Sequence, residues 1–212
     1  MSQKVTIREH DFLLHPSGAI YWLQKEMLLI ADVHFGKVTH FRRYGAAIPK
    51  NASEENFNKL KVLVDEIQPK TVCFLGDLFH SKINSEWETF KNWVQTNQTA
   101  VILISGNHDI IPKYMYEDIS VDVVDQLEIN GFLLTHHPTE KHSCFNFSGH
   151  IHPGVRMKGS GRQTVKLACF YKTKSQLILP AFGNFTGKHI LSPKDNDEIF
   201  AIVENEVICV SK

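Results

Sequence analysis

Five short apolar segments of this sequence each end in a residue that can bind a metal ion. The candidates carry carboxylate, amide or imidazole groups, and they are Asp32, His34, Asp77, Asn107, His136, His150 and His152. Because strands of an α/β sheet converge at their carboxyl ends, ligands that are far apart in sequence can meet at one edge. The pattern therefore predicts a metal site at the edge of a sheet.

The donor atoms of this set are nitrogen and oxygen, without sulfur. Imidazole prefers the later transition metals, so the set favours Mn, Fe or Zn over Mg or Ca. Seven ligands are too many for one ion that keeps an open position. With Asp77 as a bridge they divide between two divalent ions, as in hydrolases whose metals lie about 3.5–4 Å apart. We expect two divalent transition-metal ions, with Mn first.

Each motif alone has an ordinary explanation. Asp-x-His after a strand is often a surface pair, Gly-Asp is a common turn, and a His-His pair occurs on surfaces by chance. Gly-Asn-His-Asp at 106–109 and Gly-His-Ile-His at 149–152 are rarer. Because all five occur in one chain and each follows an apolar segment, the metal-binding interpretation is favoured.

The elements that must position these residues are short apolar strands and amphipathic helices. A helix is expected from Ala52 to Ile67, and a second begins at Ser85 as its N-cap. Asn130-Gly131 is typical of a hairpin turn. The expected strands are 12–15, 19–23, 27–31, 71–75, 100–104, 121–124, 127–129, 132–135, 145–148, 164–170, 176–179, 200–203 and 207–210. We predict an α/β fold with two packed sheets and helices outside, in a single domain that spans residues 1–212.

The bulk composition gives no reason to expect a membrane or a generally cationic protein. The 23 Lys and Arg balance the 23 Asp and Glu, and no apolar run approaches the length that spans a bilayer. The four cysteines are scattered and form no metal-binding pair. We therefore expect a cytoplasmic protein that makes no membrane contact, in which any binding of DNA depends on a local patch.

The ordered motifs resemble the signature of the calcineurin-like metallophosphoesterases over about residues 28–152: D-x-H, G-D, G-N-H-D, a single H, then G-H-x-H. The resemblance implies a four-layer α/β/β/α sandwich of two mixed sheets flanked by helices, with a bridged dinuclear site. One metal would take Asp32, His34, Asp77 and His152. The other would take Asp77, Asn107, His136 and His150. His108 would be the catalytic acid that protonates the leaving oxygen.

Two positions depart from the family pattern. The fourth motif contains both His136 and His137, and the position of His136 at the strand end favours it as the ligand. Many relatives have an Asp three residues after the bridging Asp, where this chain has His80. A histidine cannot orient and charge His108 as a carboxylate would. His80 is thus either a contact for substrate phosphate or a solvated loop residue.

Further segments are similar to the bacterial DNA-ligase-associated branch of this family, namely 36–37, 40–45, 48–49, 76–81 and 179–187. That resemblance implies a phosphodiesterase or endonuclease of DNA repair, working beside a DNA ligase and a helicase. Arg42 and Arg43, with Lys37, form either a phosphate-binding edge or a solvated helix face. Asn184 either enters the site from a loop or caps the turn at Phe182-Gly183.

The expected function is a dinuclear metal-dependent phosphodiesterase or endonuclease that acts on nucleic acid, with DNA as the expected partner. The alternatives are a phosphomonoesterase or pyrophosphohydrolase acting on a small molecule, and a non-catalytic metal-binding scaffold of a repair complex. His108 argues against the scaffold, because a scaffold needs no acid beside its metals. The sequence leaves the natural substrate, the native metal and the oligomeric state open.

Overall fold

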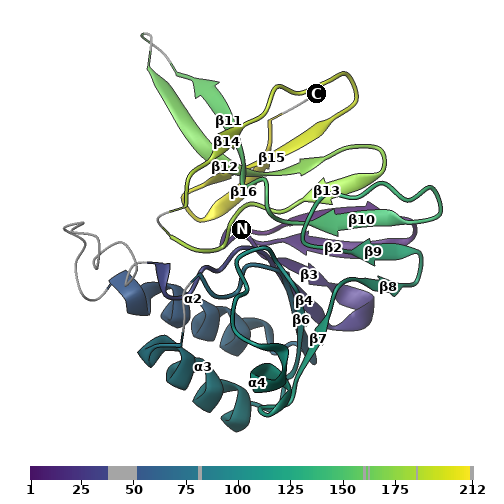
Figure 1. Ribbon diagram of the computed structural model, residues 1–212. Helices are drawn as coiled ribbons and strands as arrows, with labels where there is room; N and C mark the ends of the chain where they lie inside the picture. Colours follow the sequence, from purple (N-terminus) through teal and green to yellow (C-terminus); the bar gives the residue numbers. More distant parts are fainter. Residues whose placement is uncertain (38–51, 81–82, 160, 162, 185, 211–212) are drawn as a thin grey trace.

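The computed structural model describes residues 1–37, 52–80, 83–159, 161, 163–184 and 186–210, and in it two β-sheets pack face to face (Figure 1). The predicted α/β fold with two mixed sheets is confirmed.

The first sheet has seven strands in the order β1-β2-β3-β4-β5-β6-β7. Its first four strands pair antiparallel, and β4 to β7 pair parallel. The strands are β1 (Gln3–Ile7), β2 (His10–Leu14), β3 (Ile20–Trp22), β4 (Met27–Ile30), β5 (Thr71–Leu75), β6 (Ala100–Ile104) and β7 (Val121–Val124). The parallel half thus brings the carboxyl ends of β4, β5 and β6 to one edge.

The second sheet has nine strands, in the order β14-β11-β12-β13-β10-β9-β8, with β15 paired to β12 and to β16. The strands are β8 (Leu127–Ile129), β9 (Phe132–Leu134), β10 (Phe145–Ser148), β11 (Pro153–Lys158), β12 (Thr164–Lys172), β13 (Gln176–Ile178), β14 (His189–Ile190), β15 (Glu198–Val203) and β16 (Glu206–Cys209). Because β9 and β10 are parallel, their carboxyl ends also share an edge. β11 and β12 form an antiparallel hairpin that reaches beyond the body of the molecule (Figure 1).

The helices lie against the outer face of the first sheet (Figure 1). They are the α-helices α2 (Ala52–Ile67), α3 (Ser85–Thr96) and α4 (Lys113–Glu117), whereas the short 3-10 turn η1 (Leu23–Lys25) connects β3 to β4. α3 begins one residue after its cap, because Asn84 rather than Ser85 accepts the Glu86 backbone N–H at 2.8 Å. Within the described residues, no α-helix follows α4. The described layers are therefore a layer of helices, then the first sheet, then the second sheet.

Two apolar cores hold these layers together. Leu60, Phe74 and Phe90 belong to the core between the helices and the first sheet. Phe12, Trp22 and Phe147 belong to the core between the two sheets. Burial of such large apolar surfaces is the main stabilising contribution to the fold. These cores fix the two sheet edges at which the candidate ligands stand.

Three strands of the structure, β1, β11 and β14, were not predicted from the sequence. β1 and β14 are edge or near-edge pieces, and β11 begins with Pro153 and Gly154, two residues that usually interrupt a strand. The Asn130-Gly131 turn has the positive φ values, 52° and 78°, that its sequence predicts. No described helix is both long enough and apolar enough to span a membrane.

Candidate metal centre

The seven candidate ligands come together where the two sheets meet. They stand on the segments that follow β4, β5, β6, β9 and β10, each directly after or within a few residues of the strand end. Asp32, His34, Asp77 and His136 are at most 2% exposed. Burying so many polar groups is costly unless they are paired or coordinate a cation. The convergence that the sequence predicts is therefore present.

Five of these residues have left-handed backbone conformations. Their φ values are 55° for Asp32, 55° for His34, 53° for Asp77, 68° for His150 and 51° for His152. Each such conformation costs a non-glycine residue about 1–3 kcal/mol, and it concentrates at functional sites. The chain therefore turns at Asp32 and again at His34 instead of continuing the strand that precedes them.

Close packing around the ligands explains two glycines. A Cβ on Gly76 would lie 2.3 Å from Nδ1 of His136, and Gly76 also has a φ of 82°. A Cβ on Gly106 would lie 2.3 Å from both the backbone N and Oδ1 of Asp77. Any side chain at either position would displace a candidate ligand.

Asp77 lies between two groups of ligands. Its Oδ2 is 3.4 Å from Nε2 of His34, and its Oδ1 is 3.5 Å from Nε2 of His136. Burial opposes ionisation of this carboxyl, but hydrogen bonds from His34 and from the His108 backbone N–H outweigh it. The pKa of Asp77 is therefore held below its usual range. A carboxylate with one oxygen toward each group can bridge two cations.

The first group comprises Asp32, His34 and His152, whose ligand atoms lie close enough together to hold one ion. Asp32 Oδ1 faces His152 Nε2 at 3.3 Å, and neither atom has a hydrogen-bond partner among the residues described. Burial is the largest influence on His34 and lowers its pKa, which keeps the imidazole in its neutral, metal-binding form. Two buried, unpartnered donors facing each other fit a bound cation.

The second group surrounds Nε2 of His136. That nitrogen is 3.0 Å from Oδ1 of Asn107 and 3.2 Å from Nδ1 of His150. The other ring nitrogen, Nδ1, donates to the Leu75 carbonyl at 2.9 Å, which leaves the lone pair on Nε2. His136, Asn107 and His150 thus place their ligand atoms close together, beside Oδ1 of Asp77.

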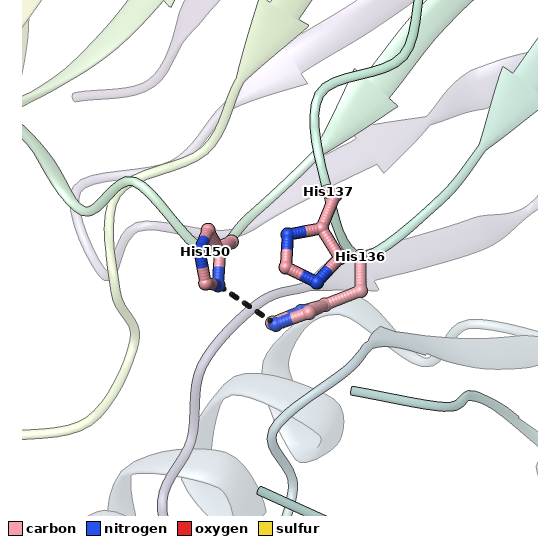
Figure 2. Close-up of side chains that lie close together, drawn as sticks. All are labelled: His136, His137 and His150. Atoms are coloured by element: carbon pink, nitrogen blue, oxygen red, sulfur yellow. Dashed lines mark hydrogen bonds between the residues drawn. The ribbon is translucent and has the colours of Figure 1, made fainter. Parts of the chain in front are cut away.

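His137 stands beside this second group but is exposed. The rings of His136, His137 and His150 lie close together (Figure 2). The ring centroids are 4.7 Å apart for His136 and His137, and 4.0 Å apart for His137 and His150. The three have ligand atoms near enough to hold an ion, so His137 remains an alternative. The tautomer fixed by Leu75 favours His136.

Alanine substitutions separate the two histidines. We expect His136→Ala to lower metal content and activity, because it removes a donor that is 2% exposed and oriented by the Leu75 carbonyl. His137→Ala should leave the metal content largely intact, and it serves as the matched control. Elemental analysis of both purified variants is the measurement. The reverse pattern would transfer the ligand role to His137.

His108 lies at the open side of the site, beside both the bridge and His80. Its backbone N–H donates to Asp77 Oδ1 at 2.9 Å. Its ring stacks on that of His80, with centroids 4.3 Å apart and planes tilted by 32°. Burial is the largest influence that lowers the pKa of His80 to about 4, followed by electrostatic effects of His108, His34 and Lys37. His80 therefore meets His108 as a neutral ring at neutral pH.

Asp109 holds the loops of the site rather than its imidazoles. Its Oδ2 accepts the backbone N–H groups of Asp77 and Gly106, both at 2.8 Å, and its Oδ1 accepts that of Phe79 at 3.1 Å. It thereby ties the segment after β5 to the segment after β6.

The remaining candidates lie farther out. The side chain of Asn184 donates to Oε2 of Glu55 at 3.1 Å, and its backbone N–H donates to Oδ1 of Asn56. Burial lowers the pKa of Lys37, while the nearby carboxylates of Asp32 and Asp77 favour its charged form. Arg42 and Arg43 lie outside the described residues.

Sequence reasoning missed two supporting residues. Thr186 places its Oγ1 3.3 Å from Nδ1 of His34. Asn56 is 5% exposed, donates to the Val33 carbonyl at 3.1 Å and receives the backbone N–H of Asn184. Its place four residues before Leu60, on the apolar face of α2, is the signal that could have found it.

Comparison with known proteins places this geometry in context. The family model "Calcineurin-like phosphoesterase" matches residues 26–151, more than half of the chain. No curated protein sequence matches significantly. The crystal structure of the nuclease MPE from Pseudomonas putida is similar over 99% of this chain and 100% of that chain, with 26% sequence identity and a TM-score of 0.81.

Two other solved structures are less similar. AQ665, a protein of unknown function from Aquifex aeolicus, has 19% identity and a TM-score of 0.40, over 59% of this chain and 78% of that one. Wild-type Vps29 complexed with Zn²⁺ from Entamoeba histolytica has 15% identity and a TM-score of 0.34, over 86% and 96%. Of these three structures, the nuclease is the one whose similarity covers nearly all of both chains at a high TM-score.

Proposed function

The chain belongs to the calcineurin-like phosphoesterase family, and from this premise we propose that it is a dinuclear metal-dependent phosphodiesterase acting on nucleic acid. The observation that carries the proposal is the position of Asp77, with one oxygen toward His34 and the other toward His136. A single carboxylate between two groups of neutral donors suits two cations.

The donor set also supports the choice of metal. We propose that Asp32, His34 and His152 complete one site, and that Asn107, His136 and His150 complete the other. Imidazole, carboxylate and amide donors suit Mn, Fe or Zn, and we propose Mn first. Two such ions would supply Lewis acidity toward a phosphoryl group and lower the pKa of a bound water to about 7.

The protein's own residues would orient the ions and protonate the product. Leu75 holds the His136 tautomer, and Asp109 holds the backbone of Asp77. We assign to His108 the donation of a proton to the leaving oxygen, because it is exposed at the mouth of the site while its backbone is anchored to Asp77. His80, stacked on His108, restricts the orientation of that ring.

The preference for diesters in nucleic acid is drawn from the solved relative. The similar Pseudomonas putida protein is described as a nuclease, and it matches this chain from end to end. An endonuclease role in DNA repair, beside a DNA ligase and a helicase, rests on the ligase-associated motifs in the sequence. Both are proposals for this chain.

A paired assay tests the proposed activity. Protein loaded with Mn²⁺ should hydrolyse bis(p-nitrophenyl) phosphate faster than p-nitrophenyl phosphate, with Asp77→Asn as the control for contaminating phosphatases. Faster monoester hydrolysis would favour a phosphomonoesterase. Two bound metals without turnover of either ester would favour a scaffold.

A further inference from the structure

The segment that carries the last two ligands is strongly basic within a neutral chain. Between Glu140 and Asp195 there is no Asp or Glu. The same segment contains nine Lys and Arg, which are Lys141, Arg156, Lys158, Arg162, Lys166, Lys172, Lys174, Lys188 and Lys194. The chain as a whole has 23 positive and 23 negative residues, so this charge is a local feature. A local excess of one sign attracts polymers of the opposite charge.

The β11–β12 hairpin presents part of this charge on one face. Arg156 of β11 is directly opposite Lys166 of β12, and Lys158 is opposite Thr164. Side chains alternate between the two faces of a strand, so Arg156, Lys158 and Lys166 share a face. All three are exposed. We use the name basic hairpin face for these three residues together with Lys188, whose position is described next.

The same face leads back to the metal centre. Gly154 is opposite Ala168 in the register, two residues before Arg156 and two after Lys166, so both belong to this face. Ala168 lines a cavity of about 400 Å³ together with His152 and Lys188. A Cβ on Gly154 would lie 2.9 Å from Cβ of Lys188, which places Lys188 over this face. The cationic side chains therefore continue outward from a cavity that a candidate ligand lines.

A partly buried ammonium group adds to the cavity. Lys59 Nζ donates to the Phe182 carbonyl at 2.7 Å and lies 4.0 Å from the centroid of the Phe182 ring. Burial lowers the pKa of Lys59 to about 8. One acidic residue, Glu55, also lines the cavity, and it accepts a hydrogen bond from Asn184. The cavity thus combines cationic and polar groups beside His152.

The basic hairpin face is not neutralised by the protein. Within the ranges that the structure describes, Arg156, Lys158, Lys166 and Lys188 take part in no ion pair. Lys172, farther along β12, does pair with Glu198. Like charges directly across a strand pair are destabilising. An external polyanion would relieve the repulsion between Arg156 and Lys166.

We propose that the basic hairpin face binds the phosphate backbone of a nucleic-acid strand whose scissile phosphodiester lies at the metal centre. The inference rests on the proposed function and deepens it, since it names the surface that holds the substrate away from the cleaved bond. A small phosphoester would fill only the cavity beside His152. A strand would continue along the hairpin, where the cations stand one after another.

The test uses the strand as a competitor in the aryl diester assay. Mn²⁺-loaded protein hydrolyses bis(p-nitrophenyl) phosphate, and single-stranded DNA is added as the inhibitor. The DNA is longer than the site of about 4–16 nucleotides that one single-strand-binding domain typically covers. The variant is Arg156→Glu/Lys166→Glu. The control is Lys25→Glu/Lys91→Glu, which makes the same change of charge on η1 and α3, where neither lysine forms an ion pair within the described residues.

We expect the inhibition constant of the DNA to rise about 10- to 100-fold in the hairpin variant. The slope of the logarithm of DNA affinity against the logarithm of salt concentration should become shallower by about 0.7 for each phosphate contact that is lost. Turnover of the aryl diester without DNA should stay unchanged in both variants. Equal inhibition of hairpin variant and control, or no inhibition of the unmodified protein, would overturn the inference.

The two proposals fail in different ways. If the metal-loaded protein does not hydrolyse the aryl diester, the proposed function is wrong. The hairpin is then judged by fluorescence anisotropy of the same labelled DNA, with the same expected loss of affinity. If the diester is hydrolysed but the hairpin variant binds DNA as tightly as the control, only the hairpin inference is wrong.

Discussion

Asp77→Asn is expected to remove at least one metal ion and nearly all turnover. The two carboxylate oxygens of Asp77 face different ligand groups, and the substitution replaces one of them with an amide NH₂ that cannot bind a cation. It also removes a negative charge that offsets the charge of the ions. The loss of activity should be larger than the about 10- to 100-fold loss that is typical when a residue hydrogen-bonded to a metal ligand is removed.

The control for this experiment is Asp65→Asn, the same chemical change at an exposed position near the end of α2, which leads into the amino end of β5. It should keep both metals and full activity. Elemental analysis and the aryl diester assay are run on both variants. If Asp77→Asn retained two metals per chain together with its activity, Asp77 would not be the bridge.

The second large effect concerns His108, on which catalysis rather than metal binding depends. A nucleotide alkoxide is a poor leaving group that needs a proton as the P–O bond breaks, whereas nitrophenolate leaves readily without one. General acid catalysis is typically worth about 10²–10⁴-fold. His108→Asn should therefore lose about that factor on an alkyl or nucleotide diester and far less on a nitrophenyl diester.

His108→Asn should also keep both metals, because the contact that joins residue 108 to Asp77 is made by the backbone N–H and survives the substitution. His142→Asn, at an exposed position, is the matched control. Equal losses on both substrates, with metals bound, would mean that His108 holds phosphate charge instead of donating a proton. Loss of metal would mean that His108 is a ligand.

The sequence predicts the strands that carry the ligands because these strands are short, apolar and bounded by glycine. Thr71–Leu75 and Ala100–Ile104 are found at their predicted bounds, and each is followed by a candidate ligand. Residues that can bind a metal, when they follow such strands, indicate a metal site even when the tertiary contacts are unknown. Convergence then follows from the parallel arrangement of the strands.

The local backbone of the site could not be predicted in the same way. Asp32 and His34 follow a predicted strand at close spacing, and nothing in that pattern indicates that both have a φ of 55°. Such conformations are unfavourable on their own, and tertiary contacts impose them. Asp32, for example, receives the His150 backbone N–H at 2.9 Å from the other sheet.

The supporting contacts also depend on tertiary structure. Asp109 is adjacent in sequence to His108, yet its carboxylate bonds to backbone groups on a different loop. The stacking of His80 on His108 joins the segment after β5 to the segment after β6. Neither contact leaves a periodic signal in the sequence. The hairpin strand β11 did leave one, in the alternation of Val155, Arg156, Met157 and Lys158, but the Pro153-Gly154 pair before it obscured the signal.

The presence of two metals around one carboxylate is the central claim, and anomalous scattering from crystals of Mn²⁺-loaded protein measures it directly. We predict two Mn peaks about 3.5–4 Å apart, with Asp77 between them. Asp32, His34 and His152 should surround one peak, and Asn107, His136 and His150 the other. A single peak, or two peaks of which neither contacts Asp77, would contradict the claim.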